Sequence, residues 1–104
     1  SGAKYVVFDT DRISAILARD HYSAILVDGN EHLSDDSLDK LSERLDETHF
    51  VRVHRSAVIN MRFVGELQHE GDRKYVAVLT DTAKTRVAIS RERLDEVKAR
   101  FGIG

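Results

Sequence analysis

The sequence has no cysteine, no proline and no tryptophan among its 104 residues. Because it lacks cysteine, it can form neither a disulfide framework nor a thiolate zinc site, and this composition is typical of cytoplasmic proteins. No apolar run approaches the roughly 20 residues that cross a bilayer as a helix, and the N-terminus has no signal-peptide pattern. These absences exclude a disulfide-stapled secreted scaffold and a helical membrane span. We therefore expect a cytoplasmic domain that does not insert into lipid.

Motifs that would support catalysis or metal binding are also missing. The sequence contains no Gly-x-Ser-x-Gly nucleophile elbow, no His-x-x-x-His pair and no glycine-rich phosphate loop. His49 and His54 are five residues apart, and this spacing puts them on opposite faces of a continuous strand. We predict no enzymatic activity, no metal and no cofactor.

The length and composition are those of one small globular domain. With 41% apolar residues the chain can bury a single core, so we assign residues 1–104 to one domain and interpret Ser1-Gly2 as an expression remnant. The net charge of −2 hides an asymmetry. Residues 1–49 hold 5 Lys or Arg against 11 Asp or Glu, whereas residues 50–104 hold 11 against 7. The basic second half can present a positive face despite the overall charge.

Short strands dominate the predicted secondary structure. Apolar patterns and turn signals such as Asp28-Gly29 predict strands at residues 4–8, 13–18, 22–28, 31–33, 50–53, 57–60, 63–69, 74–80 and 85–89. Two helices are expected. Ser34 would cap the first, with Leu33 stapled onto a stripe of Leu38, Leu41 and Leu45, and Ser90 would cap the second, with Ile89 stapled onto a stripe of Leu94, Val97 and Phe101 before Gly102. Because βα units do not alternate, we predict a mostly β (β-rich α+β), antiparallel fold with two packed helices.

The most informative stretch is Phe50–Asn60, which places three basic side chains inside an apolar run. One buried row of a period-2 pattern is formed by the odd-numbered positions Val51, Val53, Ala57 and Ile59. Arg55 falls in the same row, where an unpaired guanidinium would be costly to bury. We expect a bend at His54-Arg55-Ser56 that turns Arg55 outward, toward a polyanion or a carboxylate.

Three further polar residues each have more than one interpretation. His21 lies at a turn between strands, where it is either an exposed turn histidine or a hydrogen-bonding partner for a base edge. Tyr22 beside it either belongs to the core or gives its hydroxyl to a phosphate. Arg52 shares a strand face with His54, and its simplest interpretation is a surface ion pair with an acidic residue of the first half, which would contribute little stability.

Arg91 and Arg93 flank Glu92 in the first turn of the last helix. They form either a solvated face or an anion site, because the unbonded N–H groups of a helix start can act together with nearby arginines. Arg73-Lys74, by contrast, is interpreted as ordinary charge at a hairpin tip. Each of these signals is weak when taken alone.

Taken together, the residues resemble a known family. Phe50–Asn60 resembles the central signature of the LytTR-type DNA-binding domain of bacterial transcription regulators, in which a phenylalanine, an arginine and a His-Arg-Ser lead into an apolar run ending in asparagine. The similarity continues in order along nearly the whole chain, at residues 9–13, 21–22, 37–41 and 87–94.

The resemblance implies an elongated, mostly β domain that binds DNA through loops, often as a dimer on paired repeats. Carried over by position, His21 and the region of Glu92 would enter major-groove sites, with Arg91 in the same closing segment, and Arg55 would lie near the intervening groove. Phosphates would be held by Arg52, Ser56 and Arg93, with help from Tyr22. Two residues depart from the family pattern: Ala57 replaces a usual aromatic residue, and Glu92 stands where many members have arginine.

We therefore expect sequence-specific binding of double-stranded promoter DNA by a bacterial transcription regulator, of the response-regulator type used in two-component signalling. The resemblance also implies an N-terminal receiver, sensor or membrane segment that this sequence lacks. The alternative is a regulatory protein-interaction module that keeps the fold without binding DNA. Its working surface would be the acidic face with Asp35, Asp36, Asp39 and Glu43.

Overall fold

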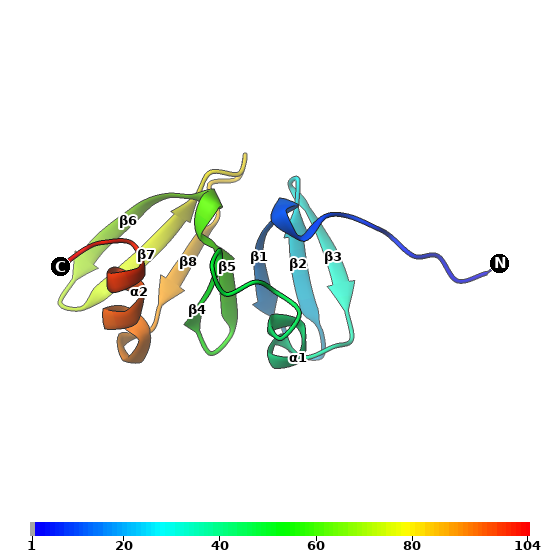
Figure 1. The fold of residues 1–104 in the computed structure, drawn as a ribbon, viewed down its shortest axis with the longest axis horizontal. Helices are drawn as coiled ribbons and strands as arrows, with labels where there is room; N and C mark the ends of the chain where they lie inside the picture. Colours follow the sequence, from blue (N-terminus) through cyan, green and yellow to red (C-terminus); the bar gives the residue numbers. More distant parts are fainter. Residues whose placement is uncertain (1) are drawn as a thin grey trace.

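The computed structural model describes residues 2–104 and contains two antiparallel sheets side by side along the long axis (Figure 1). The first sheet has the order β3-β2-β1-β5-β4, from the strands β1 (Ile13–Ala18), β2 (Ser23–Val27), β3 (Asn30–Ser34), β4 (Phe50–His54) and β5 (Ala57–Asn60). The second has the order β6-β7-β8, from β6 (Val64–Gly71), β7 (Lys74–Leu79) and β8 (Arg86–Ile89). The predicted elongated, mostly β fold is confirmed, with extents of 52 × 24 × 24 Å that include the extended N-terminal segment.

Two short α-helices and three single 3₁₀ turns complete the chain. The elements are α1 (Leu38–Ser42), α2 (Leu94–Arg100), η1 (Thr10–Arg12), η2 (Met61–Phe63) and η3 (Arg91–Arg93). Helix α2 ends as its sequence predicts, because Gly102 adopts a φ of +73° and two backbone bonds, from Gly102 N to Ala99 O and from Ile103 N to Lys98 O, close the last turn.

The hairpin of β4 and β5 lies between two hydrophobic clusters and joins the two halves of the molecule. The predicted buried row is confirmed, since its odd-numbered residues Val51, Val53, Ala57 and Ile59 all pack in the larger cluster with β7, β8 and α2. On the other face, Phe50 and Val58 pack in a smaller cluster with α1, β1 and β2. Burial on both faces fixes the orientation of this hairpin.

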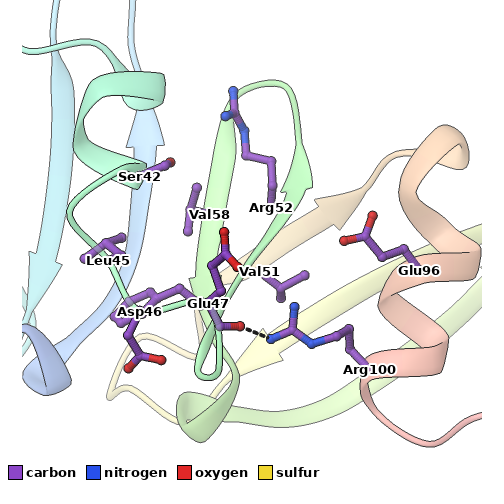
Figure 2. A pocket seen from close by; sticks show the side chains of 10 residues that line it. Ser42, Leu45, Asp46, Glu47, Val51, Arg52, Val58, Glu96 and Arg100 are labelled. Carbon is purple, nitrogen blue, oxygen red and sulfur yellow. Dashed lines mark hydrogen bonds between the residues drawn. The ribbon is translucent and has the colours of Figure 1, made fainter.

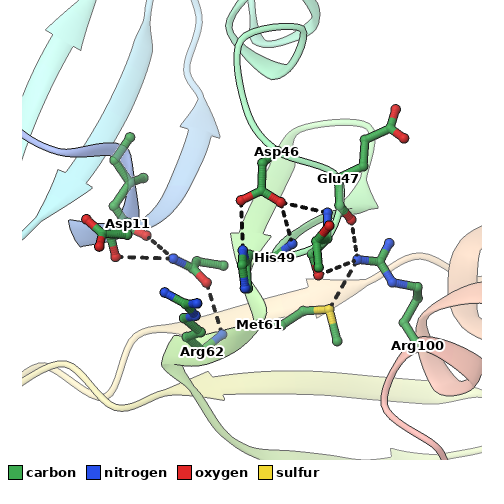
Figure 3. A network of polar contacts seen from close by, with 10 residues as sticks. Asp11, Asp46, Glu47, His49, Met61, Arg62 and Arg100 are labelled. Carbon is green, nitrogen blue, oxygen red and sulfur yellow. Dashed lines mark hydrogen bonds and ion pairs between the residues drawn. The ribbon is translucent and has the colours of Figure 1, made fainter.

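Polar contacts reinforce the junction between the halves (Figure 3). From α2, Arg100 Nη2 donates to Glu47 O at 2.6 Å and to Thr48 O at 3.3 Å. The buried Asn60 side chain donates to Ile13 O at 3.0 Å, which ties β5 to the start of β1. Arg100 therefore fixes α2 to the loop that precedes β4.

Three local predictions were wrong. Ser90 does not cap the second helix, because its hydroxyl accepts no backbone N–H bond and the 3₁₀ turn η3 separates it from α2, which begins at Leu94. Residues 4–8 form no strand, and Tyr5 and Val7 are 88% and 89% exposed, because a strand sequence needs a partner and none lies beside it in residues 2–104. The first helix is capped by Ser37, whose Oγ accepts from Lys40 N at 3.2 Å, and not by Ser34, which ends β3. Leu33 is 65% exposed, so it does not staple the helix. Of the expected remnant Ser1-Gly2, Ser1 lies outside the described residues.

Candidate nucleic-acid interface

Three loops that are far apart in the sequence lie in a row along one long edge of the molecule, the lower edge in Figure 1. Loop 1 (residues 19–22) joins β1 to β2, loop 2 (residues 55–56) joins β4 to β5, and loop 3 (residues 90–93) joins β8 to α2. Backbone bonds connect neighbours in this row, since Ala18 N donates to Ser56 O and Ser90 N donates to Val53 O, both at 2.8 Å. The fold thereby holds the three loops side by side.

The row collects most of the residues that the sequence singled out. Loop 1 carries His21 and Tyr22, loop 2 carries Arg55 and Ser56, and loop 3 carries Arg91, Glu92 and Arg93. Ser56 and Arg93 are half-buried, whereas the other five are exposed. The eighth predicted residue, Arg52, lies within β4 behind loop 2. Seven of the eight therefore share one surface, although their contacts with DNA remain predictions.

The expected bend at residues 54–56 is confirmed as a two-residue hairpin turn. The pairing register of β4 and β5 shifts between Arg52 and His54, and this bulge turns Arg55 out of the buried row to the surface. The Arg55 side chain makes no hydrogen bond or ion pair with residues 2–104, so its guanidinium is available to an external anion. Because Arg55 is exposed, its guanidinium is not buried without a partner, and this was the reason for predicting the bend.

Arg52 holds loop 2 in place from inside the chain. Its Nε donates to His54 O at 2.9 Å, its Nη2 donates to Arg55 O at 2.6 Å, and its Nη1 contacts Asp39 Oδ1 at 2.8 Å. The ion pair with an acidic residue of the first half is thus confirmed. Three of the five guanidinium N–H donors are used in these bonds, which leaves at most two for a phosphate.

His54 and Ser56 bond to each other across the same turn. The backbone N–H of Ser56 donates to His54 Nδ1 at 3.2 Å, and Ser56 Oγ lies 2.9 Å from the same nitrogen. Because a backbone N–H can only donate, Nδ1 must accept, and the neutral ring carries its proton on Nε2. Nearby, Ala57 lines a hollow of about 190 Å³ together with Leu17 and Val87.

The charge along the row changes from one end to the other. Loop 1 and the start of α1 line a depression of about 300 Å³ that contains the carboxylates Asp20, Asp35 and Asp36. At loop 3, Arg91 and Arg93 have no acidic partner in the described part of the chain. The row is therefore acidic beside loop 1 and basic at loop 3.

On or beside each loop lies one arginine that is held by a carboxylate. The pairs are Arg19 with Glu31 at 3.1 Å, Arg52 with Asp39 at 2.8 Å and Arg73 with Asp95 at 3.5 Å. Sequence reasoning did not assign Arg19 or Arg73 to this surface. The partners are 12 to 22 residues apart in the chain, so only the fold brings them together.

A crevice of about 340 Å³ opens between the α1–β4 loop and α2 (Figure 2). Leu45, Val51 and Val58 are among its lining residues, and the Arg52 guanidinium points along the hairpin toward loop 2. The Ser42 hydroxyl on its border donates to Leu38 O at 2.8 Å. The polar groups of Arg52, Arg100 and Ser42, which line this crevice, thus bind other groups of the same chain.

Two further features are absent from the described residues. No helix within residues 2–104 is long and apolar enough to cross a membrane. The same part of the chain holds no group of three or more His, Asp or Glu residues arranged to bind a metal ion.

The chain is similar to known bacterial regulators. It is 30% identical over 100 residues to the heme-containing CO-sensing transcriptional regulator RcoM 1 of Paraburkholderia xenovorans, covering 96% of this chain and 37% of that protein. Over 66 residues it is 33% identical to the transcriptional regulatory protein LytR of Staphylococcus aureus, covering 64% of this chain and 26% of that protein. The chain thus spans less than two-fifths of either relative.

A solved structure shows the same fold. The LytTr DNA-binding domain of a putative methyl-accepting/DNA response regulator from Bacillus cereus superposes with a TM-score of 0.80 at 16% identity, covering 89% of this chain and 84% of that one. The family described as "LytTr DNA-binding domain" matches residues 3–102, which is nearly the whole sequence. The chain therefore belongs to the LytTR DNA-binding domain family.

Proposed function

We propose that this domain binds double-stranded DNA sequence-specifically, with loops 1, 2 and 3 entering successive grooves along one face of the duplex. The observation that carries the proposal is the alignment of His21, Arg55 and Arg91 on one long edge, each on a different loop. Unpaired guanidinium groups supply attraction to phosphates, whereas side chains that reach base edges supply sequence preference.

Within this proposal the residues divide into three roles. Arg91 and Arg93 hold phosphates, and His21, Arg55 and Glu92 face base edges, where Glu92 would accept from a cytosine amino group. Arg52 and Ser56 support loop 2, and Tyr22 assists loop 1. This division puts most of the affinity at loop 3 and spreads the sequence preference over all three loops.

The proposal extends to the regulator that contains the domain. Because RcoM 1 and LytR are transcriptional regulators much longer than this chain, we infer that the domain works with an input domain, a receiver or a sensor, in a bacterial cytoplasmic regulator. Two copies would occupy paired repeats of a promoter as a homodimer.

A protein-interaction module without DNA binding is the second candidate. Its surface would be the acidic face of α1, but Asp39 pairs with Arg52, and Asp36 pairs with Lys40 and Arg44. Much of that face is therefore neutralised within the chain. The basic loop 3 has no such partner for Arg91 or Arg93, which favours DNA.

Selection of bound duplexes from a random pool tests the proposal directly. A recovered consensus with two half-sites is expected, and the affinity for it should fall steeply as salt rises from about 50 to 200 mM. Arg55→Ala should weaken binding to that consensus by about 1–3 kcal/mol. No binding to any duplex at low salt would reject the proposal in favour of the interaction module.

A further inference from the structure

The tip of the β6–β7 hairpin holds an arginine in an unfavourable backbone conformation. Asp72 and Arg73 are the two turn residues, and Arg73 has a φ of +53°. This left-handed region suits glycine and asparagine at hairpin turns and is costly for a long side chain. Because strained positions are common at functional sites, the contacts of the Arg73 side chain show whether it has a role.

The Arg73 side chain reaches from this hairpin to loop 3. Its Nη2 donates to the carbonyl oxygen of Arg91 at 3.2 Å and lies 3.5 Å from Asp95 Oδ1 at the start of α2. The same carbonyl accepts the backbone N–H of Leu94, which closes the 3₁₀ turn η3. Arg91 O thus receives one donor from its own turn and one from a hairpin 18 residues away.

We propose that Arg73 is a positioning residue for DNA binding, which clamps the backbone of the Arg91–Arg93 turn so that Glu92 faces a base edge. The inference rests on the proposed function of loop 3. It parallels loop 2, where Arg52 donates to the carbonyl oxygens of His54 and Arg55. In both places an arginine outside the loop fixes the loop backbone, and other side chains of the loop remain exposed.

This role differs from a direct phosphate contact, to which a half-exposed Arg73 could also contribute. A phosphate contact adds sequence-independent affinity, and its loss lowers the slope of log K against log salt by about 1. Loss of a residue that positions the loop backbone instead weakens the preferred duplex more than a random one. The salt slope stays unchanged, because the long side chains of Arg91 and Arg93 still reach phosphates. The two roles can therefore be separated by measurement.

The variant Arg73→Gly separates function from folding, because glycine removes the guanidinium and also relieves the left-handed strain. Its melting temperature should be at or above that of the wild type. Lys84→Gly is the matched control: Lys84 also has a positive φ, of +51°, and lies on the opposite long edge between β7 and β8 (Figure 1). Both changes remove one positive charge and one strained residue.

Binding of the selected duplex and of a random duplex would be measured for the three proteins over a range of salt. We expect Arg73→Gly to lose on the order of tenfold affinity for the selected duplex only, with an unchanged slope, and Lys84→Gly to match the wild type. In the absence of DNA, Arg73→Gly should also speed hydrogen exchange at the Leu94 amide.

The possible results lead to different conclusions. Wild-type protein that binds no duplex would overturn the proposed function, and the inference with it. Wild-type protein that binds while Arg73→Gly binds equally well, or loses affinity for all duplexes with a lower slope, would overturn the positioning role alone. Unchanged exchange at Leu94 would also contradict it.

Discussion

Loop 1 and loop 3 lie at opposite ends of the same row but in opposite electrostatic surroundings. Loop 1 is flanked by Asp20 and Asp35, whereas loop 3 carries Arg91 and Arg93 without acidic partners among residues 2–104. A loop surrounded by carboxylates repels phosphates, so any preference for DNA at loop 1 has to come from hydrogen bonds to bases. The difference indicates that loop 3 contributes most of the affinity for phosphates, whereas loop 1 contributes sequence preference alone.

The largest effect is expected from removing the cations at the basic end. The double change Arg91→Ala and Arg93→Ala should weaken binding to selected and random duplexes alike, on the order of tenfold for each arginine near 0.1 M salt, and lower the salt slope by about 2. Fluorescence anisotropy over a salt series measures both quantities. An unchanged slope would show that loop 3 does not hold phosphates.

A smaller and more selective effect is expected at the acidic end. His21→Ala should weaken the selected duplex by about 1 kcal/mol, leave random duplex binding unchanged and relax the preference at one base position. The same anisotropy assay with single-base variants of the consensus measures this. Equal weakening of every duplex would instead assign His21 to the phosphate backbone.

Removing the carboxylates beside loop 1 should act in the opposite direction. Asp20→Asn combined with Asp35→Asn should strengthen binding to any duplex by roughly two- to fivefold at low salt, since exposed charges interact weakly and are screened. The gain should disappear near about 0.5 M salt. The control is Glu43→Asn, at an exposed acid that follows α1 outside the loop 1 depression, and an equal gain there would contradict the local explanation.

The smallest effect concerns stability and pH. The hydrogen bond from His49 Nδ1 at 2.7 Å lowers the pKa of the Asp46 carboxyl, with further bonds from the His49 and Thr48 backbone (Figure 3). Because the folded pKa is depressed, this stabilisation is present above the unfolded pKa, about 3.9, and is lost as pH falls through the folded value. The melting temperature of Asp46→Asn should therefore fall less steeply than that of the wild type as the pH is lowered. An identical pH dependence of the two melting temperatures would exclude Asp46 as a contributor.

Local patterns predicted the features whose causes are local. The period-2 row from Val51 to Ile59 predicted a buried face, and the cost of burying Arg55 predicted the bend, because both follow from the pleat of a strand. The helix cap was displaced from Ser34 to Ser37 because both serines precede an apolar stripe and only the tertiary structure selects between them.

Features that depend on distant partners were not predictable. Residues 4–8 have a strand sequence, but no neighbouring strand in the described chain pairs with them. Arg73 was interpreted as hairpin-tip charge because nothing in its own sequence shows that the tip meets the carbonyl of Arg91. On loops 1 and 3 the candidate residues had more than one interpretation from their turn and helix-start positions, and only the resemblance to a family gave them roles on DNA.

The bonds between neighbouring loops have a consequence for the partner. Since Ala18 N is bonded to Ser56 O and Ser90 N to Val53 O, the separation between loops is set by the spacing of hydrogen-bonded backbones, about 5 Å per strand, and resists stretching. If the three loops enter successive grooves as proposed, an edge of fixed length cannot adjust to the spacing of the grooves, and the duplex has to adjust its shape instead. Flexible pyrimidine–purine steps between the contacted bases should then favour binding at positions that no side chain touches.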